Sequence, residues 1–555
     1  MNGAADRIRS SIPRGLGALL VVAFVFYALV FLKGRGIDYW YKAYDTRYYQ
    51  ELAEAFLSGR LDLPRQVPPE ILSNPHDFTA NAARIYDARM FDLSLYEGRV
   101  YLYFGAVPAA LFYAPFRLLI GRGLPDAAAV TFFSFGSVLF TTYLLCLLRK
   151  AYFPSAPGWM ALASAAALAF ANGTPFLIRD SRVYEVAISS GVFFATASAA
   201  CWLSAVVDRD FSWRRMALGS LLLGLAVGCR PIYVWMAAAL LPWMAVLALR
   251  ASAGRPAREE SLRALVLPLV FMAVVLGLYN FLRFGNPLEF GVSYQMNEPN
   301  LFGIAKAFAP DKVFHNIHFL FFQEPLVDDA FPFVYLNRHV PFYILTPGNV
   351  TFREGQGTVG LLPGIPFLWI AFLAPAVWWA CAEDGPSTTP RWRVVVRALC
   401  QTVGLYFAVY LLADPRGPFQ FRDTAAFSVL LANFKEEVPA LIPFLAILFG
   451  NVVWDVRCRL RAVAPGRRPP FPWREWGALA SAFTAIAAVY FFYMAINVRY
   501  TCELAWPAIL LTAGIWFYFD ALLECEPLCR RAVRVSAVAA AVLSAYFWIV
   551  FSYLK

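Results

Sequence analysis

The chain has 555 residues, of which 60% are hydrophobic and 15% are charged. A soluble globular protein is nearer to about 45–50% apolar and about 25% charged residues, so the composition excludes an ordinary soluble domain. The formal net charge is +11. In a soluble protein, this charge would suggest binding to nucleic acid. Here the basic residues fall in short loops between apolar runs, as the positive-inside rule describes. We therefore predict an all-α integral membrane protein without a nucleic-acid partner.

The first predicted element is a transmembrane helix from about Leu16 to Leu32, preceded by Arg7, Arg9 and Arg14. These arginines place the N-terminus on the cytoplasmic side and deliver the following residues to the outer face. The polar stretch 33–125 is then a first large outer loop. Within it, the apolar run 101–120 is expected to lie along the membrane interface, because a crossing there would put every later basic loop outside.

The later apolar runs are each long enough to cross roughly 30 Å of hydrocarbon as a helix. Together with the first helix they predict about thirteen spans, with the C-terminus outside. A second large polar stretch, 283–358, falls on the same outer face. The expected organisation is an N-terminal module 1–290, an outer loop 291–358 and a C-terminal bundle 359–555. The runs lie at 126–148, 159–178, 186–206, 213–229, 232–249, 263–282, 359–381, 397–413, 426–453, 476–496, 502–522 and 535–552.

Asp45 is the first candidate for chemistry, in a segment that also holds Tyr44 and Tyr48. It precedes a short amphipathic stretch around Leu52, which we predict to be a helix lying on the membrane. An Asp before a helix is commonly an N-cap that stabilises the helix by about 1 kcal/mol. The alternative is a carboxylate at the membrane surface that takes a proton from an acceptor hydroxyl, which requires hydrogen-bonding reach. The residues alone leave both readings open.

A second outer segment, running from Tyr86 to Pro108, is dense in tyrosine, aspartate and arginine and includes Asp92 and Tyr103. Aromatic faces together with carboxylates suit a sugar ring, but they equally suit an aromatic belt at the membrane interface.

Three further charged residues fall at the predicted outer ends of helices. Glu185 opens a predicted span, Arg230 lies at the turn of a tight helical hairpin, and Arg499 is followed by Tyr500. Ionisable groups near lipid are costly and usually functional, although a group at a helix end can simply meet water. Arginines at this surface can hold phosphate oxygens with two hydrogen bonds. They can equally extend to lipid headgroups.

The sequence predicts neither a nucleotide nor a metal site. It has no phosphate loop, dinucleotide turn or nucleophile elbow. His315 and His318 are spaced to share a helical face, but a zinc site needs a third ligand, and Cys525 and Cys529 find no partners for a metal set. The sequence therefore predicts no cofactor for which a set of ligands can be named. A divalent metal stays open, because Asp45 lacks a neighbouring acidic residue and only Asp38 or Glu185 is left as a second carboxylate.

The layout of one helix, a long outer loop with an early acidic residue and many further helices resembles the GT-C superfamily of polyprenyl-phosphate-dependent glycosyltransferases. Within it, the chain looks most like the aminoarabinose transferase and protein mannosyltransferase group. The likeness covers about the first 290 residues and the Arg-Tyr pair near 499. It rests on Asp45 with Tyr48, the turn Leu57–Leu61, the segment Asp92–Pro108, and the segments Gly224–Pro231, Tyr279–Pro287 and Arg499–Tyr500.

The resemblance implies a GT-C-like bundle with large outer-face loops and juxtamembrane helices. It implies that Asp45 is the general base of an inverting transfer from a polyprenyl-phosphate sugar to a hydroxyl of a lipid, glycan or protein acceptor. Outer-face arginines such as Arg499 would hold the lipid phosphate. The implied donor- and acceptor-binding residues are Tyr44, Tyr48, Asp92, Tyr103, Glu185, Arg230, Arg499 and Tyr500.

We expect a bacterial inner membrane with the site on the extracytoplasmic side. The alternative function is a polytopic transporter or lipid flippase, which would show repeats, broken helices and mid-membrane charges.

Overall fold

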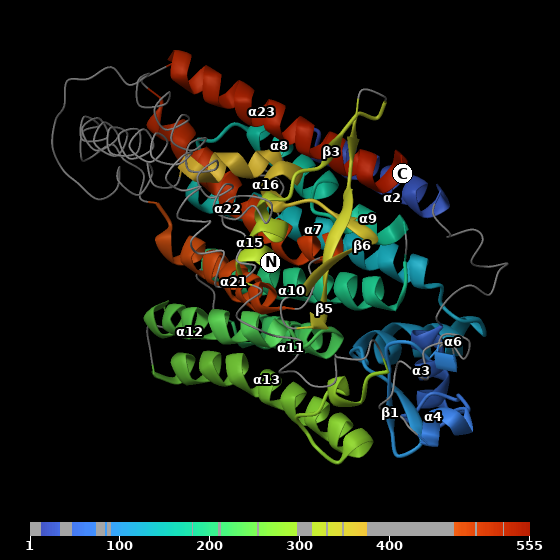
Figure 1. Ribbon diagram of the computed structural model, residues 1–555. Coiled ribbons are helices and arrows are strands. Elements are labelled where there is room, and N and C mark those ends of the chain that lie inside the picture. Colours follow the sequence, from blue (N-terminus) through green and yellow to red (C-terminus); the bar gives the residue numbers. More distant parts are fainter. Residues whose placement is uncertain are drawn as a thin grey trace, which may run out of the picture.

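The computed structural model describes thirteen stretches of the chain: 13–33, 47–73, 84–85, 90–179, 181–208, 212–251, 255–296, 313–328, 331–346, 349–373, 471–493, 497–524 and 527–554. Tyr44 and Asp45, and the spans expected at 397–413 and 426–453, lie outside these residues. Most described residues belong to helices that lie roughly side by side, with α3, α4, α6 and β1 gathered at one end (Figure 1).

The long helices follow the predicted apolar runs closely. They are α2 (Leu16–Lys33), α7 (Asp126–Tyr152), α8 (Gly158–Phe170), α9 (Thr174–Arg179), α10 (Val183–Val207), α11 (Trp213–Cys229), α12 (Tyr233–Ala251), α13 (Arg255–Phe284), α21 (Trp473–Phe492), α22 (Thr501–Leu522) and α23 (Pro527–Ile549). Among the described residues, 8 helical segments are long and apolar enough to cross a membrane, with α8 and α9 counted as one. The protein is thus a multi-pass helical membrane protein, and the count of about thirteen spans stays a prediction.

Two expected spans differ in the structure. The described part of 359–381 is the short helix α16 (Leu361–Gly364) followed by the 3-10 segment η6 (Pro366–Leu373). Pro363 and Pro366 explain the break, because proline lacks the N–H that a continuous α-helix requires. The expected span 159–178 is interrupted between α8 and α9, where the Asn172 side chain accepts hydrogen bonds from the Thr174 N–H at 2.9 Å and hydroxyl at 2.8 Å.

The run 101–120 does not form a long helix. Its last part is a π-helical turn, η2 (Ala109–Tyr113, 5 residues), that continues into α6 (Ala114–Ile120, 7 residues). A crossing needs about 20 residues, so this element is too short to span the membrane. The structure thus agrees with the expectation that this run does not cross as a single long helix, and its position along the interface stays a prediction.

The predicted outer loops contain strands, which the all-α prediction missed. Three antiparallel hairpins pair β1 (Leu93–Tyr96) with β2 (Arg99–Leu102), β3 (Leu326–Val327) with β4 (Val334–Tyr335), and β5 (Asn337–Thr346) with β6 (Asn349–Thr358). The other short elements are α3 (Tyr48–Leu57), α4 (Pro69–Ser73), η3 (Val292–Tyr294), α15 (Val313–Ile317), η5 (His318–Phe322), η8 (Val498–Tyr500) and η9 (Val550–Leu554). These strands were missed because β1 to β4 have only 2 to 4 residues each, and β5 and β6, with 10 residues each, lack a sustained alternation of apolar and polar residues.

The two large loops contact each other at one end of the bundle. The Met296 N–H donates to the Leu93 carbonyl at 2.7 Å, and the Asp92 N–H donates to the Met296 carbonyl at 2.9 Å. Arg283, at the end of α13, donates to the Leu102 carbonyl at 2.8 Å. Since these contacts join residues about 200 positions apart, both loops lie on the same side of the helices, as predicted.

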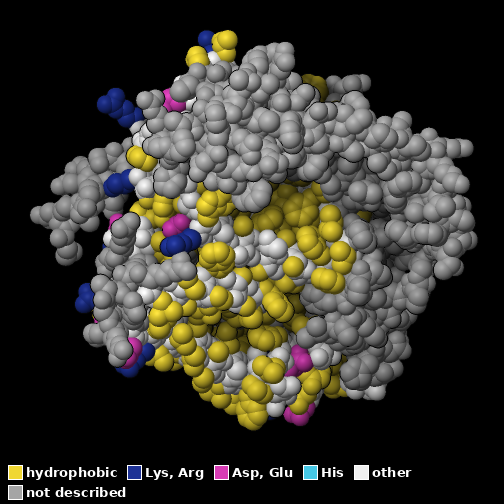
Figure 2. Space-filling view, turned by 90° about the vertical axis from the view of Figure 1, so that its left-hand side faces the viewer, with side chains coloured by type: hydrophobic (Ala, Val, Ile, Leu, Met, Phe, Trp, Pro, Cys, Tyr) yellow, Lys and Arg dark blue, Asp and Glu magenta, His cyan; other side chains and the backbone are white. Residues whose placement is uncertain are grey.

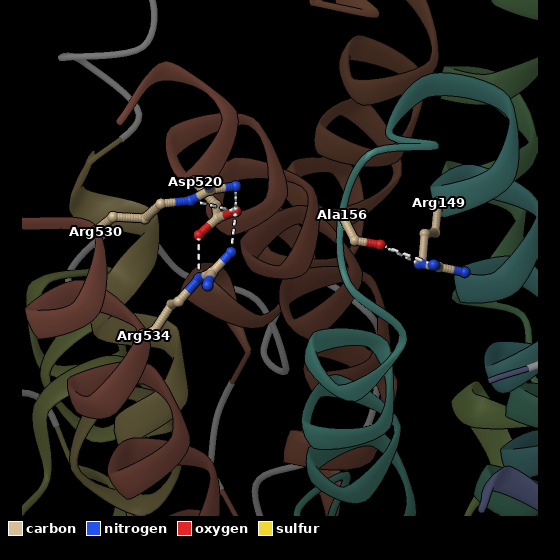
Figure 3. A network of polar contacts seen from close by, with 5 residues as sticks. All are labelled: Arg149, Ala156, Asp520, Arg530 and Arg534. Atoms are coloured by element: carbon tan, nitrogen blue, oxygen red, sulfur yellow. Dashed lines mark hydrogen bonds and ion pairs between the residues drawn. The ribbon is translucent and has the colours of Figure 1, made fainter. Parts of the chain in front are cut away.

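The opposite end of the bundle holds the basic loops and a network that ties α22 to α23 (Figure 3). The buried Asp520 carboxylate accepts from Arg530 at 2.8 Å and from Arg534 at 2.6 Å. In the turn after α7, Arg149 donates to the Ala156 carbonyl at 2.7 Å. Polar groups within the bundle are therefore paired where two helices end, which limits the desolvation cost.

Small residues allow the central helices to pack closely. A methyl group at Gly219 of α11 would lie 2.3 Å from Trp202 Cδ1 of α10, closer than atoms can approach. The Trp202 indole N–H donates to the Met216 carbonyl of α11 at 3.2 Å. Such small-residue contacts are a main source of helix association in membranes, because lipid supplies no hydrophobic force between helices. They hold α10 and α11 in fixed register, and the candidate site lies at their ends.

Candidate functional site

Glu185 and Arg499, two predicted site residues, form a buried ion pair at the end of the bundle that carries the large loops. Glu185 lies in the first turn of α10, where its carboxylate accepts from the Arg182 N–H at 3.1 Å. Its other oxygen accepts from Arg499 of η8 at 3.3 Å, and the two side chains are only 3% and 14% exposed. The pair joins residues more than 300 positions apart in the sequence and brings the start of α10 to the start of α22.

The Arg499 guanidinium lies among aromatic rings. It is 4.2 Å from the centre of the Tyr184 ring and 5.7 Å from that of Tyr500. Contacts of this kind stabilise a cation by about 0.5–2 kcal/mol, depending on desolvation. Within the described residues, the buried Nε of Arg499 has no hydrogen-bond partner. A buried donor of this kind calls for an acceptor.

Arg230 forms a second buried pair beside the first. It follows the last residue of α11 and donates to the Glu503 carboxylate of α22 at 2.9 Å. Glu503 is fully buried and also accepts a hydrogen bond from the Tyr490 hydroxyl of α21. The Arg230 guanidinium lies 5.0 Å from the centre of the Tyr500 ring, which stacks on Tyr490 at 4.7 Å. The Tyr500 ring is therefore shared by the two arginines.

We call this group the arginine–tyrosine cluster. Its members are Tyr184, Glu185, Arg230, Tyr490, Arg499, Tyr500 and Glu503.

The loop that follows β2 closes the cluster on one side. Phe104 packs edge-on against Tyr184 with ring centres 5.0 Å apart, and Tyr103 packs against Phe104 at 4.8 Å. Burial raises the pKa of Tyr103 to about 12, so its hydroxyl is a neutral donor at physiological pH. A methyl group at Gly105 would lie 2.1 Å from the Gly228 carbonyl oxygen, so only glycine lets the loop pass this close to the turn that carries Arg230.

Asp92 and Tyr48 belong to the packing of the loops around β1. Asp92 adopts a positive φ of 61° and accepts from the Gln295 side chain at 2.8 Å. The Tyr48 hydroxyl donates to the Phe91 carbonyl at 2.8 Å, and Arg65 lies over the Tyr48 ring at 4.9 Å. These contacts give both residues a role in joining the hairpin to α3 and to the second loop.

Of the predicted residues, the structure brings five into or against the arginine–tyrosine cluster: Tyr103, Glu185, Arg230, Arg499 and Tyr500. The N-cap reading of Asp45 is wrong, because α3 begins after Arg47, which occupies the N-cap position with φ 51° and no capping side-chain bond. Asp45 itself lies outside the described residues, and its role as a base stays a prediction.

Glu503, Tyr490 and Tyr184 were missed. Glu503 carried a usable signal, because a carboxylate inside the apolar run 502–522 marks a functional candidate. The two tyrosines carried none, since tyrosine is common at both ends of membrane helices.

The described residues hold no group of three His, Cys, Asp or Glu side chains that could bind a metal ion. The arrangement is instead suited to an anion, because two guanidinium groups flank one ring and each is backed by a buried carboxylate. The surrounding rings offer flat faces of the kind that pack against sugars.

The chain matches no protein-family model, and no curated protein matches it. One solved structure is similar: the crystal structure of the Archaeoglobus fulgidus oligosaccharyltransferase in the apo form, with 13% sequence identity and a TM-score of 0.30. The match covers 87% of this chain and 56% of that chain, so this chain spans little more than half of that protein's length. At this identity and TM-score, the similarity carries no conclusion about fold or activity.

Proposed function

We propose that the chain is a membrane glycosyltransferase that moves a sugar from a polyprenyl-phosphate donor to an acceptor hydroxyl on the extracytoplasmic face. The arginine–tyrosine cluster is the observation that carries this proposal. Arg230 and Arg499 supply guanidinium donors at the ends of membrane helices, where a lipid phosphate would lie. The tyrosine rings around them provide faces for the attached sugar.

The proposed reaction is a displacement with inversion. The acceptor oxygen attacks the anomeric carbon while the bond from that carbon to the phosphate oxygen breaks. The bonding electron pair leaves on the lipid phosphate, and the acceptor proton passes to the Asp45 carboxylate. Charge on the phosphate grows as the bond breaks, so Arg499 and Arg230 stabilise the transition state more than the bound donor.

A small apolar cavity lies within the bundle, between α7, α10, α12, α21 and α22. Its volume is about 60 Å³, and its lining includes Met236, Leu240, Trp202 and Trp506. Leu148, Val206 and Glu475 also line it, so the cavity extends toward the helix ends opposite the cluster. Figure 2 shows the end of the molecule opposite the large loops, where hydrophobic side chains surround a hollow. The lining suits a small apolar group, and the proposed function does not depend on this cavity.

The transporter or flippase alternative has one observation in its favour, the break between α8 and α9. A break in a transporter commonly leaves backbone groups to bind a substrate. Here the break is filled from within the chain, because Asn172 accepts from Thr174 and the Tyr27 hydroxyl donates to the Ala169 carbonyl at 2.9 Å. The charged pairs lie at helix ends, which favours the transferase.

The test is release of free polyprenyl phosphate by detergent-purified protein incubated with a panel of polyprenyl-phosphate sugars. We expect release by the wild type and none by Asp45→Asn, with both proteins equally folded. Arg499→Ala should lower kcat by about 10²–10³-fold, the usual effect of removing one donor to a developing oxyanion. Arg117→Ala is the matched control, because Arg117 forms an exposed pair with Glu54, and such pairs contribute little.

Release by none of these proteins with any donor would refute the transferase. Release that persists in Asp45→Asn would refute the base assignment alone.

A further inference from the structure

We propose that Glu503 is a positioning residue that fixes the Arg230 guanidinium for the donor phosphate. This inference rests on the proposed function and adds to it a residue that does not itself contact the reacting atoms. It starts from the burial of Glu503, whose side chain is fully enclosed in the first turn of α22. Its carboxylate accepts from Arg230 at 2.9 Å and from the Tyr490 hydroxyl.

A contribution to folding stability does not by itself explain the buried ion pair between Arg230 and Glu503. A buried ion pair often contributes nothing net, because the desolvation penalty of both charges offsets their attraction. The pair also lies at the end of a helix whose span, Val498–Leu522, is 89% buried and is already held by apolar packing. A carboxylate in this place is better explained by what it does to Arg230.

Three contacts define where the Arg230 side chain lies. Its backbone closes α11, with the Arg230 N–H donating to the Ala226 carbonyl at 2.9 Å. Its guanidinium packs over the Tyr500 ring at 5.0 Å, and Glu503 accepts from one terminal nitrogen. A guanidinium has five N–H donors in a rigid plane, so fixing one of them against a ring orients the others. The hydrogen bond to Glu503 therefore fixes the rotation of the Arg230 guanidinium plane.

Glu503 also opposes the charge that it orients, and this gives the inference a signature. Glu503→Gln removes a negative charge beside Arg230. This change in charge alone favours binding of an anionic donor. The orientation is lost at the same time, and misplacement of a catalytic group by about 1 Å can cost about 10²-fold. We therefore expect kcat to fall by about 10- to 100-fold while the KM for the donor stays the same or decreases.

Asp520→Asn is the matched control on the same helix. Asp520 is a buried carboxylate at the opposite end of α22 and binds two arginines, Arg530 and Arg534, away from the cluster. Its loss should lower the melting temperature and leave kcat per folded molecule and the donor KM unchanged. If Glu503→Gln behaves in the same way as Asp520→Asn, its role is structural and the inference is overturned.

A double-mutant cycle with Arg230→Lys tests whether Glu503 acts through Arg230. Lysine keeps the charge but not the planar fork, so little orientation remains for Glu503 to supply. The double variant should then lose no more kcat than Arg230→Lys alone, and Glu503→Asp should recover part of the loss seen with glutamine. Additive losses would show independent action and refute positioning.

Retention time on size exclusion and the melting temperature identify a variant that fails to fold, and the conservative pair Glu503→Asp and Arg230→Lys then provides the comparison. The failure of the proposed function is a separate outcome, because it would appear as a wild-type protein that releases no polyprenyl phosphate from any donor.

Discussion

Tyr500 is the residue around which the candidate site is arranged. Its ring receives Arg230 on one side at 5.0 Å and Arg499 at 5.7 Å, and it stacks on Tyr490. Two guanidinium groups this near one another would repel without compensation. Glu185 and Glu503 provide it, so the cluster without ligand has equal numbers of arginines and carboxylates.

Asp62 provides a pH-dependent test at the residue scale, outside the spans. The hydrogen bond from the Arg60 guanidinium lowers the pKa of Asp62 below its ordinary value. A carboxylate with a depressed pKa in the folded state stabilises the protein above its unfolded pKa of about 4, and this contribution is lost as the pH falls through the folded value.

The melting temperature of Asp62→Asn should therefore lie below that of the wild type near pH 7, and the two should converge below about pH 4. Asp208→Asn is the control, since Asp208 forms an exposed pair with Arg215 and its loss should change the melting temperature little. A constant difference across the pH range would contradict the linkage.

At the scale of elements, apolar length predicted most of the long helices but none of the hairpins. The expected spans 126–148 and 502–522 match Asp126–Tyr152 and Thr501–Leu522 within a few residues. Hydropathy fixes such helices because backbone groups in lipid have no partner outside the segment. The strand Leu93–Tyr96 depends on partners in Arg99–Leu102 and on the bridge from Ser94 to Gln295, which no local pattern reveals.

The candidate site was predicted only in part for the same reason. Glu185, Arg230 and Arg499 were identified because charged residues at helix ends are conspicuous in an apolar sequence. Their pairing was not predictable, since Arg230 and Glu503 are 273 positions apart and meet only because the end of α11 lies near the start of α22. A single sequence contains no signal for this contact between distant residues.

Gly105 provides a test of how the loop after β2 supports the site. Its Cβ position lies 2.1 Å from the Gly228 carbonyl and 2.5 Å from that of Cys229, so Gly105→Ala must separate two backbones. We expect at least a 10-fold loss of kcat for release of polyprenyl phosphate, because Arg230 follows directly after that turn.

Gly17→Ala is the control, since nothing lies within 4 Å of a methyl group there. Equal activity of the Gly105→Ala variant and the wild type would show that the position of this loop does not matter to the site.

At the scale of the whole molecule, the two ends of the bundle differ in composition. One end holds the large loops, the arginine–tyrosine cluster and the contact of Lys33 with the Tyr553 ring at 4.3 Å. The other holds the basic turns with Arg149 and the Asp520 network. The positive-inside rule predicts that the second end faces the cytoplasm.

Cysteine labelling in intact cells checks this orientation. Ser73→Cys and Asn286→Cys lie in exposed positions at the loop end and should react with a membrane-impermeant maleimide. Ser155→Cys, exposed between α7 and α8, should react only after permeabilisation. The native chain gives the background labelling, and the reverse pattern would place the candidate site inside the cell.

The helix α22 is anchored by acidic residues at both ends, Glu503 to Arg230 and Asp520 to Arg530 and Arg534. Its span is 89% buried, whereas the spans of α13 and α2 are 17% and 22% buried. We therefore expect α22 to keep its position, because moving it would break ion pairs at both of its ends at once. For the lipid donor of the proposed function, entry from the bilayer is then expected between the peripheral helices, which have fewer protein contacts to exchange for lipid. We therefore expect the opening motion to hinge around α22, with its two anchored ends as the stationary points.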